Sequence, residues 1–186
     1  MKYKLIIFDW DGTLMDSVGK IVGSIQVAAR TLELSVPSVE KARNVIGLSL
    51  GPALRQLFDI KNELDVELLV KAYKDAFVGH VETSSPLFDG ALALLETLKA
   101  RGHLLAVATG KGRRGLQSAW QDTQTAHYFH TSRCADDAQS KPLPDMLQQV
   151  LQELSLTPQQ ALMIGDTRYD TAMAEAIGMD RVGGEL

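Results

Sequence analysis

Two carboxylates directly follow a short apolar segment near the start of the chain. Leu5 to Phe8 are all apolar, which is typical of a strand buried on both faces of a parallel sheet. Asp9 and Asp11 come immediately after it, in a turn that Gly12 makes possible. Two like charges in contact near a protein surface repel by about 4 kcal/mol at an effective dielectric constant of roughly 20. We therefore expect a bound cation at this strand end, and carboxylate oxygens favour Mg²⁺.

The composition narrows the class of protein. A length of 186 residues suffices for one core domain with a small insertion. The net charge is −4 and the chain has no long basic run, which argues against a nucleic-acid partner. No apolar run approaches the ~20 residues that span a membrane, and the N-terminal run is too short for a signal peptide. The single cysteine, Cys134, fits a reducing compartment, so we expect a cytoplasmic α/β protein.

The spacing of apolar residues is helical through residues 16–85, with no convincing strand. The longest helix is expected from Glu63 to Gly79. Its expected buried face consists of Leu64, Leu68, Leu69, Ala72, Tyr73, Ala76 and Phe77. Residues 16–85 are therefore expected to form a small all-α domain inserted after the first strand.

An alternation of strands and helices returns after residue 86. Buried strands are expected at Leu104 to Ala108, at Phe129 to Cys134, at Ala161 to Ile164 and, at the end of the chain, near Val182. Such alternation predicts a parallel sheet with right-handed crossovers. Residues 1–15 and 86–186 are thus expected to form a Rossmann-like, three-layer α/β core.

Each polar cluster of the core lies at the carboxyl end of a predicted strand. Thr109-Gly110 follows the second strand, Lys141 comes in the loop after the third, and Asp166 and Asp170 follow the fourth. Ligands of open parallel sheets bind beyond the carboxyl ends of the strands. Two acidic pairs, a hydroxyl and a lysine gathered there suit a phosphoryl group and a metal ion.

These residues resemble the four motifs of the haloacid dehalogenase (HAD) superfamily of phosphohydrolases. In chain order the motifs are similar to Asp9-x-Asp11-Gly-Thr, Thr109, Lys141-Pro142 and Gly165-Asp166-x-x-x-Asp170. The resemblance extends from Phe8 to Gly178 and includes an all-helical cap between the first and second motifs. The sequence Thr109-Gly110-Lys111 favours the phosphoglycolate phosphatase-like branch.

The resemblance implies a catalytic role for the first motif. Asp9 would be the nucleophile that forms an aspartyl-phosphate, and Asp11 would be the general acid/base. Mg²⁺ would bind to the carboxylates of Asp9 and Asp166 and to the backbone carbonyl of Asp11.

The remaining motifs imply a phosphate-binding set. Thr109, the Gly110 amide and Lys141 would neutralise the equatorial phosphoryl oxygens, with the Trp10 amide as a further donor. Asp170 would orient Lys141 or a metal-bound water. For Lys111 two interpretations stay open, contact with an anionic substrate and a solvated position at the start of a helix.

The helical insertion would act as a cap that closes over the site, excludes water and selects the substrate. Its loop Gly47-Leu48-Ser49 lies where related caps carry a substrate-contacting loop, so these residues are carried over as substrate contacts. The hinges would lie near Met15 to Val18 and Val81 to Pro86.

The leading hypothesis is a magnesium-dependent phosphatase for a small phosphorylated metabolite, similar to phosphoglycolate phosphatases. A phosphomutase would use the same core and cap. A dehalogenase is disfavoured, because that branch lacks the second aspartate and the magnesium site. A receiver-type signalling domain shares an acidic cluster, a Thr and a Lys on a parallel sheet, and a non-catalytic phosphate-binding or regulatory protein is a third alternative.

The C-terminus departs from the family pattern. Relatives with this cap continue with a final strand and a helix packed on the sheet, whereas this chain stops just after Gly184. We expect an exposed apolar edge and either reduced stability or self-association as a homo-oligomer.

Overall fold

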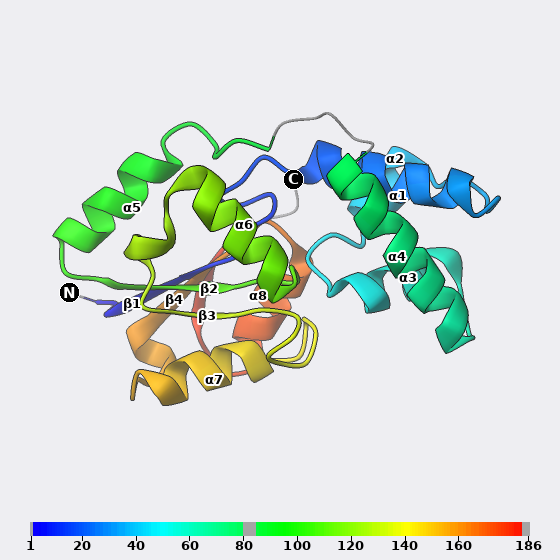
Figure 1. Ribbon diagram of the computed structural model, residues 1–186. Coiled ribbons are helices and arrows are strands. Elements are labelled where there is room, and N and C mark those ends of the chain that lie inside the picture. The colour runs from blue at the N-terminus through cyan, green and yellow to red at the C-terminus, as the bar shows by residue number, and fades with distance from the viewer. Residues whose placement is uncertain (1, 80–84, 184–186) are drawn as a thin grey trace.

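A five-stranded parallel sheet forms the centre of the molecule in the computed structural model, which describes residues 2–79 and 85–183 (Figure 1). The strand order is β3-β2-β1-β4-β5. The five strands are β1 (Leu5–Phe8), β2 (Leu104–Ala108), β3 (Thr131–Arg133), β4 (Ala161–Ile164) and β5 (Asp180–Val182). The chain runs outward from β1 to β3 and then returns to β4 on the other side of β1. The strand order therefore reverses between β1 and β4, which is the position where open α/β sheets bind ligands.

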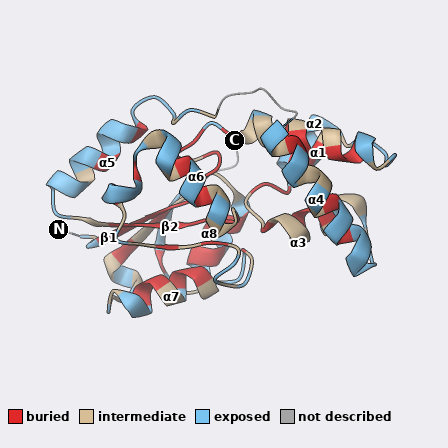
Figure 2. Ribbon diagram, in the orientation of Figure 1, coloured by how far each residue is buried: buried red, intermediate tan, exposed pale blue. Residues whose placement is uncertain are grey.

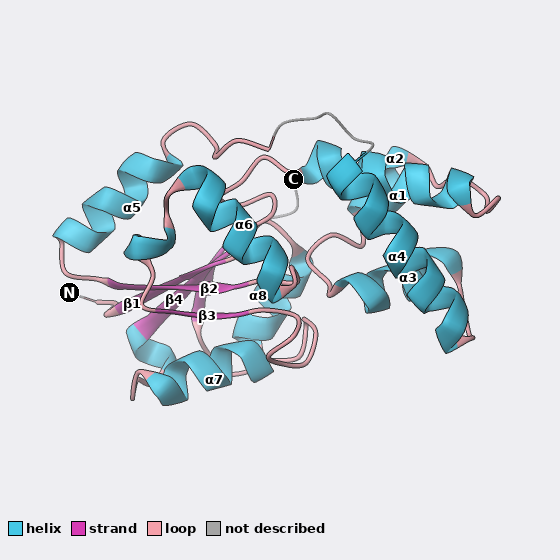
Figure 3. Cartoon of the chain, in the orientation of Figure 1, coloured by secondary structure: helices cyan, strands magenta, loops and turns pink. Residues whose placement is uncertain are grey.

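Helices cover both faces of the sheet, which confirms the three-layer α/β core (Figure 3). Leu5 and Ile7 of β1 point to the face covered by α7 (Asp145–Glu153) and α8 (Arg168–Glu175). Ile6 and Phe8 point to the opposite face. This second face is covered by α5 (Ala91–Ala100) and α6 (Arg113–Thr123). A strand with every residue apolar is thus explained by burial on both faces.

The register of the three central strands brings their carboxyl ends level. Phe8 pairs with Val107 on one side and with Ile164 on the other. The Asp9 amide then donates a hydrogen bond to the Ile164 carbonyl at 2.9 Å. Side chains that directly follow β1, β2 and β4 therefore share one edge of the sheet.

Four helices inserted after β1 form a cap with a core of its own. They are α1 (Val18–Thr31), α2 (Val39–Arg43), α3 (Leu50–Phe58) and α4 (Glu63–Gly79). Buried residues of α1, including Ile25 and Ala28, pack with Leu54 of α3 and Leu69 of α4. Figure 2 shows this buried stripe on the inner sides of the cap helices, separate from the buried layers of the sheet. The cap is thus a second packing unit beside the α/β core.

The two connections between core and cap run side by side. The Asp16 amide donates to the Pro86 carbonyl at 2.8 Å, and the Phe88 amide donates to the Leu14 carbonyl at 3.0 Å. These bonds lie next to both predicted hinges. Residues 80–84 are outside the described part of the chain, so the cap boundaries 16–85 and the second hinge remain predictions.

The buried face of α4 agrees with the predicted one at Leu69 and Ala76 but not at Leu64 and Leu68. Leu69 is fully buried, but Leu64 and Leu68 are 66% and 56% exposed. Apolar residues occur around much of this helix, so the sequence spacing does not select one face. Packing against α1 and α3 selects the face that carries Val66, Leu69 and Ala76.

The β5 edge of the sheet is exposed, as expected, but it is more charged than apolar. Val182 is 57% exposed. The two preceding residues form ion pairs: Asp180 with Lys2 at 2.9 Å and Arg181 with Glu175 at 3.1 Å. Charged side chains are a common way of blocking edge-to-edge association. Self-association therefore stays a prediction. No helix within the described residues is both long and apolar enough to cross a membrane.

Two neighbouring leucines of α4 give a direct test of the cap core. Leu69→Ala should lower the free energy of unfolding by about 2–5 kcal/mol, because it leaves a cavity among α1, α3 and α4. Leu68→Ala should change it by less than about 0.5 kcal/mol, because the side chain is mostly in solvent. Urea unfolding of both variants measures the difference, and equal losses would contradict the observed orientation of α4.

Candidate active site

A buried ammonium group holds two carboxylates at the centre of the site. Lys141 Nζ lies 2.8 Å from Asp9 Oδ1 and 2.6 Å from Asp170 Oδ1. None of the three side chains is more than 2% exposed. Burial by itself lowers the pKa of Lys141, but the charges of Asp170 and Asp9 outweigh that effect and raise it above its ordinary value. Lys141 is therefore a positive charge fixed at the carboxyl edge of the sheet.

The Asp9 carboxylate is only partly compensated by this lysine. Both of its oxygens are buried, but only Oδ1 has a partner, the ion pair with Lys141; Oδ2 has no hydrogen-bond partner within the described residues. Burial raises the pKa of Asp9 to about 8, Lys141 opposes the rise, and the charges of Asp170 and Asp166 add to it. A buried polar atom without a partner lowers the stability of the folded state, so Asp9 has the properties of a group that binds a cation or a substrate.

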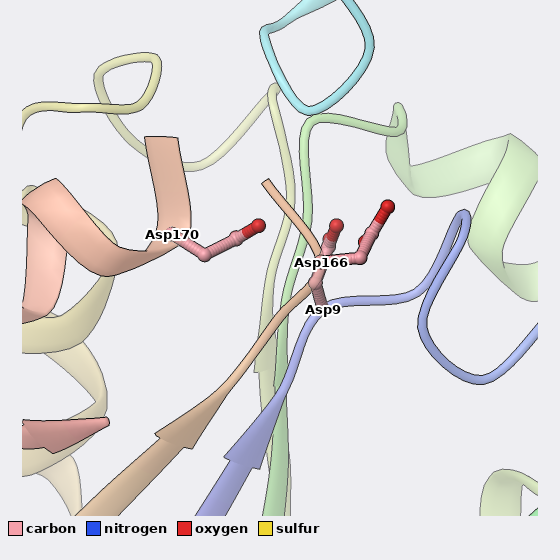
Figure 4. Close-up of side chains that lie close together, drawn as sticks. All are labelled: Asp9, Asp166 and Asp170. Carbon is pink, nitrogen blue, oxygen red and sulfur yellow. The ribbon is translucent and has the colours of Figure 1, made fainter. Parts of the chain in front are cut away.

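Three carboxylates form a cluster of the kind that holds a metal ion. Asp9, Asp166 and Asp170 each place an oxygen within 4.8 Å of the others. Figure 4 shows Asp9 and Asp166 at the ends of neighbouring strands, with Asp170 reaching toward them from α8. Burial raises the pKa of Asp166, and a hydrogen bond from Thr13 Oγ1 to its Oδ1 at 2.7 Å opposes the rise.

The hydrogen bonds distinguish the members of this cluster. Asp170 Oδ1 accepts from Lys141, and its Oδ2 accepts from the Thr167 amide at 3.1 Å and from Thr167 Oγ1 at 2.7 Å. Asp170 is thus committed to holding Lys141, which is one of the two arrangements predicted for it. The Asp9 carboxylate, whose Oδ2 has no partner within the described residues, fits a metal ion together with Asp166. The backbone carbonyl of Asp11 stays a predicted ligand.

Gly12 makes the close approach of the first and fourth motifs possible. Its φ is +88°, in the left-handed region, and a Cβ there would overlap the Asp166 carboxylate. Only glycine satisfies both requirements. The turn after β1 therefore brings Asp166 beside Asp9.

The Asp11 carboxylate is not part of the three-carboxylate cluster and has partners of its own. Lys111 Nζ binds both of its oxygens, at 2.8 and 3.0 Å, and Ser17 Oγ donates to Oδ1 at 2.7 Å. The side chains of Asp11 and Lys111 are each 12% exposed. A solvated position for Lys111 is therefore wrong, since it forms an ion pair at the boundary of core and cap. Its contact with substrate stays a prediction.

The cap loop rests directly on the second motif. A Cβ at Gly110 would overlap the backbone carbonyl oxygens of Leu48 and Gly47. The Ser49 amide also donates to Ser140 Oγ at 2.9 Å, next to Lys141. The cap loop Gly47-Leu48-Ser49 therefore lies in contact with Gly110 and next to Lys141. Thr109 is also here, 1% exposed, with its Oγ1 accepting from the Lys111 amide at 3.1 Å.

Trp10 has a structural role that the motif analysis did not state. Its side chain is fully buried beside Trp120 and Phe129, with ring centroids 6.5 and 6.1 Å away. Its indole N–H donates to Met15 Sδ at 3.3 Å. The backbone turn between the two aspartates is thereby anchored in the core. A role for the Trp10 amide stays a prediction.

The motif analysis missed a group of cap residues that lie near Lys111 and Asp11. Lys20 Nζ of α1 lies 4.7 Å from the centroid of the Phe77 ring, and Lys111 Nζ lies 5.4 Å from it. Burial raises the pKa of Tyr73, and the negative charge of Asp11 adds to the rise. The helical spacing of Tyr73 and Phe77 indicates only a packing face, so the sequence gives no signal for this contact.

The fold and the site together define a capped α/β hydrolase with an acidic centre at the switch point of its sheet. The chain belongs to the haloacid dehalogenase-like hydrolases, whose family model matches residues 6–183. It is therefore a HAD-family phosphatase with a helical cap. This assignment confirms the family resemblance, the fold class and the enzyme class expected from the motifs.

Individual relatives are moderately similar over most of their length. The chain is 33% identical to the phosphoglycolate phosphatase of Aliivibrio fischeri, over 94% of this chain and 81% of that protein. It is 28% identical to the pyrophosphatase PpaX of Bacillus cereus, over 96% of this chain and 81% of that protein. A solved structure from Bacteroides fragilis, assigned to the haloacid dehalogenase-like hydrolases, matches with a TM-score of 0.90 at 26% identity, over 98% of this chain and 87% of that one. A predicted phosphoglycolate phosphatase from Haemophilus somnus matches with a TM-score of 0.84 at 26% identity, over 98% and 85%.

The contact between Gly110 and the cap loop can be tested by adding one methyl group. Gly110→Ala should displace the loop from the core, because the new Cβ meets backbone rather than a flexible side chain. We expect the Ser49 amide to exchange with solvent at least about tenfold faster, since its bond to Ser140 is lost. Gly19→Ala is the control, because a Cβ there meets open space. Unchanged exchange in Gly110→Ala would contradict the contact.

The raised pKa of Asp9 predicts how stability depends on pH when metal is absent. Because the folded pKa lies near 8 and the ordinary value is 3.8, ionising Asp9 costs folding free energy as pH rises between these values. In EDTA, the free energy of unfolding of the wild type, measured relative to that of Asp9→Asn, should fall by roughly 2–4 kcal/mol from pH 5 to pH 8. Urea unfolding at both pH values measures this difference. Parallel pH profiles for the two proteins would exclude the predicted shift.

Proposed function

We propose that the protein is a magnesium-dependent phosphatase that hydrolyses a small phosphorylated metabolite through an aspartyl-phosphate. The observation that carries the proposal is the Asp9 carboxylate, which is buried beside Lys141 and Asp166 and whose Oδ2 has no hydrogen-bond partner among the described residues. A nucleophile needs free lone pairs, and the neighbouring groups suit the phosphoryl oxygens and a cation.

In the first step an oxygen of Asp9 attacks the phosphorus atom, and the bond from phosphorus to the leaving oxygen breaks. Asp11 gives its proton to that oxygen, so the product leaves as an alcohol or acid. In the second step Asp11 takes a proton from water, whose oxygen attacks the phosphorus and releases Asp9 and inorganic phosphate. Two displacements of moderate barrier replace one difficult hydrolysis.

The phosphoryl group would be held by groups that the fold has already fixed. Lys141, Thr109 and the Gly110 amide would contact the equatorial oxygens, with the Trp10 amide as a further donor. Asp170 keeps Lys141 in place through the 2.6 Å contact. Mg²⁺, held by Asp9 and Asp166, would supply positive charge that offsets the charge developing on the phosphoryl oxygens.

Asp11 must leave its present partner and take up a proton from solvent before it can act as an acid. Its carboxylate is bound by Lys111 and Ser17, so proton transfer requires Lys111 to turn to another anion. A substrate that attracts Lys111 would free Asp11 beside the leaving oxygen. The cap loop Gly47-Leu48-Ser49 would close the same space and exclude water.

The relatives indicate which substrates to test first. One is named a phosphoglycolate phosphatase and the other a pyrophosphatase. In both phosphoglycolate and pyrophosphate, the leaving group carries a second anionic group close to the scissile bond. We propose a phosphoglycolate-like substrate, and the phosphatases among the relatives favour this over a phosphomutase.

Phosphate release from p-nitrophenyl phosphate tests the proposal. Wild-type protein should release phosphate with Mg²⁺, lose activity in EDTA and regain it on adding Mg²⁺. Asp9→Asn should lower the rate at least about 10³-fold, because the nucleophile is removed. Asp122→Asn, at an exposed position of α6, is the matched control and should keep the wild-type rate. Substantial turnover by Asp9→Asn would exclude the aspartyl-phosphate.

A further inference from the structure

We propose that Lys20 of the cap and Lys111 of the core together bind a second anionic group on the leaving part of the substrate. This inference rests on the proposed function and specifies its substrate class. The substrate would be a phosphate ester or anhydride whose leaving group carries a carboxylate or phosphate a few bonds from the scissile oxygen.

The two lysines reach one aromatic ring from different parts of the chain. Lys20 Nζ from α1 and Lys111 Nζ from the loop after β2 lie 4.7 and 5.4 Å from the centroid of Phe77. A cation near an aromatic face is stabilised by about 0.5–1 kcal/mol, which is enough to orient an ammonium group but not to neutralise it. Within residues 2–79 and 85–183, no carboxylate forms an ion pair with Lys20. Its charge is therefore available to a ligand.

The two halves of the site have opposite charge imbalances. Around Asp9, three carboxylates face the single ammonium group of Lys141, so this half requires a cation. At Asp11, one carboxylate pairs with the ammonium group of Lys111, and the ring of Phe77 brings the second ammonium group of Lys20 to the neighbourhood of Lys111. The raised pKa of Tyr73 keeps that neighbouring phenol neutral. The second half therefore requires an anion.

The position of this positive charge points to the leaving group. Asp11 is the proposed donor to the leaving oxygen, and Lys111 binds both of its carboxylate oxygens, at 2.8 and 3.0 Å. Whatever replaces Asp11 as the partner of Lys111 must lie close to that oxygen. An anion on the leaving group would bind Lys111 and Lys20 together and release Asp11 for proton transfer. Substrate recognition and activation of the acid would thus be the same event.

A pair of substrates that differ only in the second anion tests this inference. 2-Phosphoglycolate and ethyl phosphate share their skeleton, but only the first carries a carboxylate. We expect wild-type kcat/KM to be at least about tenfold higher for 2-phosphoglycolate, because two partly buried ammonium groups bind its carboxylate. Lys20→Met should lower this ratio by about tenfold, chiefly through KM, because it keeps the side-chain stem and removes the charge.

Two further variants separate loss of charge from loss of structure. Lys20→Arg should keep most of the wild-type ratio, since the charge is retained. Lys74→Met changes an exposed lysine of α4 and should not alter the ratio. Thermal melting of each variant checks that the cap is folded. Inorganic pyrophosphate as a third substrate assigns the anion: a larger Lys20→Met effect on pyrophosphate indicates a phosphate, and a larger effect on 2-phosphoglycolate indicates a carboxylate.

The outcomes distinguish this inference from the proposed function. If wild-type protein hydrolyses both esters and Lys20→Met leaves their ratio unchanged, the second-anion site is overturned and the phosphatase stands. If wild-type protein hydrolyses neither ester in Mg²⁺, the proposed function fails. Calorimetric titration of 2-phosphoglycolate into the wild-type protein and into the Lys20→Met variant then tests whether Lys20 binds the second anion. Tenfold weaker binding by Lys20→Met supports it, and equal affinity overturns it.

Discussion

The site depends on one buried ammonium group, Lys141, placed between Asp9 and Asp170. Moving an ion from water into a protein interior costs several kcal/mol, which is recovered only with close partners of opposite charge. Lys141 supplies that partner for two carboxylates from different elements, Asp9 after β1 and Asp170 in α8, the helix that follows β4. Because the lysine must reach both, the ends of β1 and β4 and the loop after β3 are fixed relative to one another.

Lys141 does not fully compensate the negative charge of the carboxylates, and the least compensated of them is Asp9, the proposed nucleophile. Three carboxylates share a single lysine, and Oδ2 of Asp9 lacks a hydrogen-bond partner in the described part of the chain. An apolar or fully paired residue at position 9 would stabilise the sheet edge more. Proteins retain such unfavourable arrangements where function uses them. The site thus has an excess of negative charge at Asp9 and an excess of positive charge at Lys20 and Lys111. The first suits a cation and the second suits an anion.

Backbone groups of the cap loop contact the core directly. Carbonyls of this loop lie against Gly110, and the Ser49 amide bonds to Ser140. The hydrophobic core of the cap is separate from the two layers that pack on the sheet. Such an arrangement lets a folded unit meet the site without sharing the packing that stabilises the core. The polar cap residues nearest Asp11 are therefore suited to substrate selection.

The sequence by itself determined the sheet and the identity of the acidic centre. An all-apolar strand indicates burial on both faces of a sheet. Parallel strands place the residues that follow them at one edge of the sheet. The local pattern and the topology therefore predicted the site residues Asp9, Lys141, Asp166 and Asp170. Tertiary structure alone decided the partners of long side chains. The Asp11–Lys111 pair, the approach of Lys20 to Phe77 and the exposure of Leu64 and Leu68 depend on how the cap packs. A flexible ammonium group has many reachable partners, and a helix with apolar residues on several sides has no unique buried face, so only the packed molecule selects one.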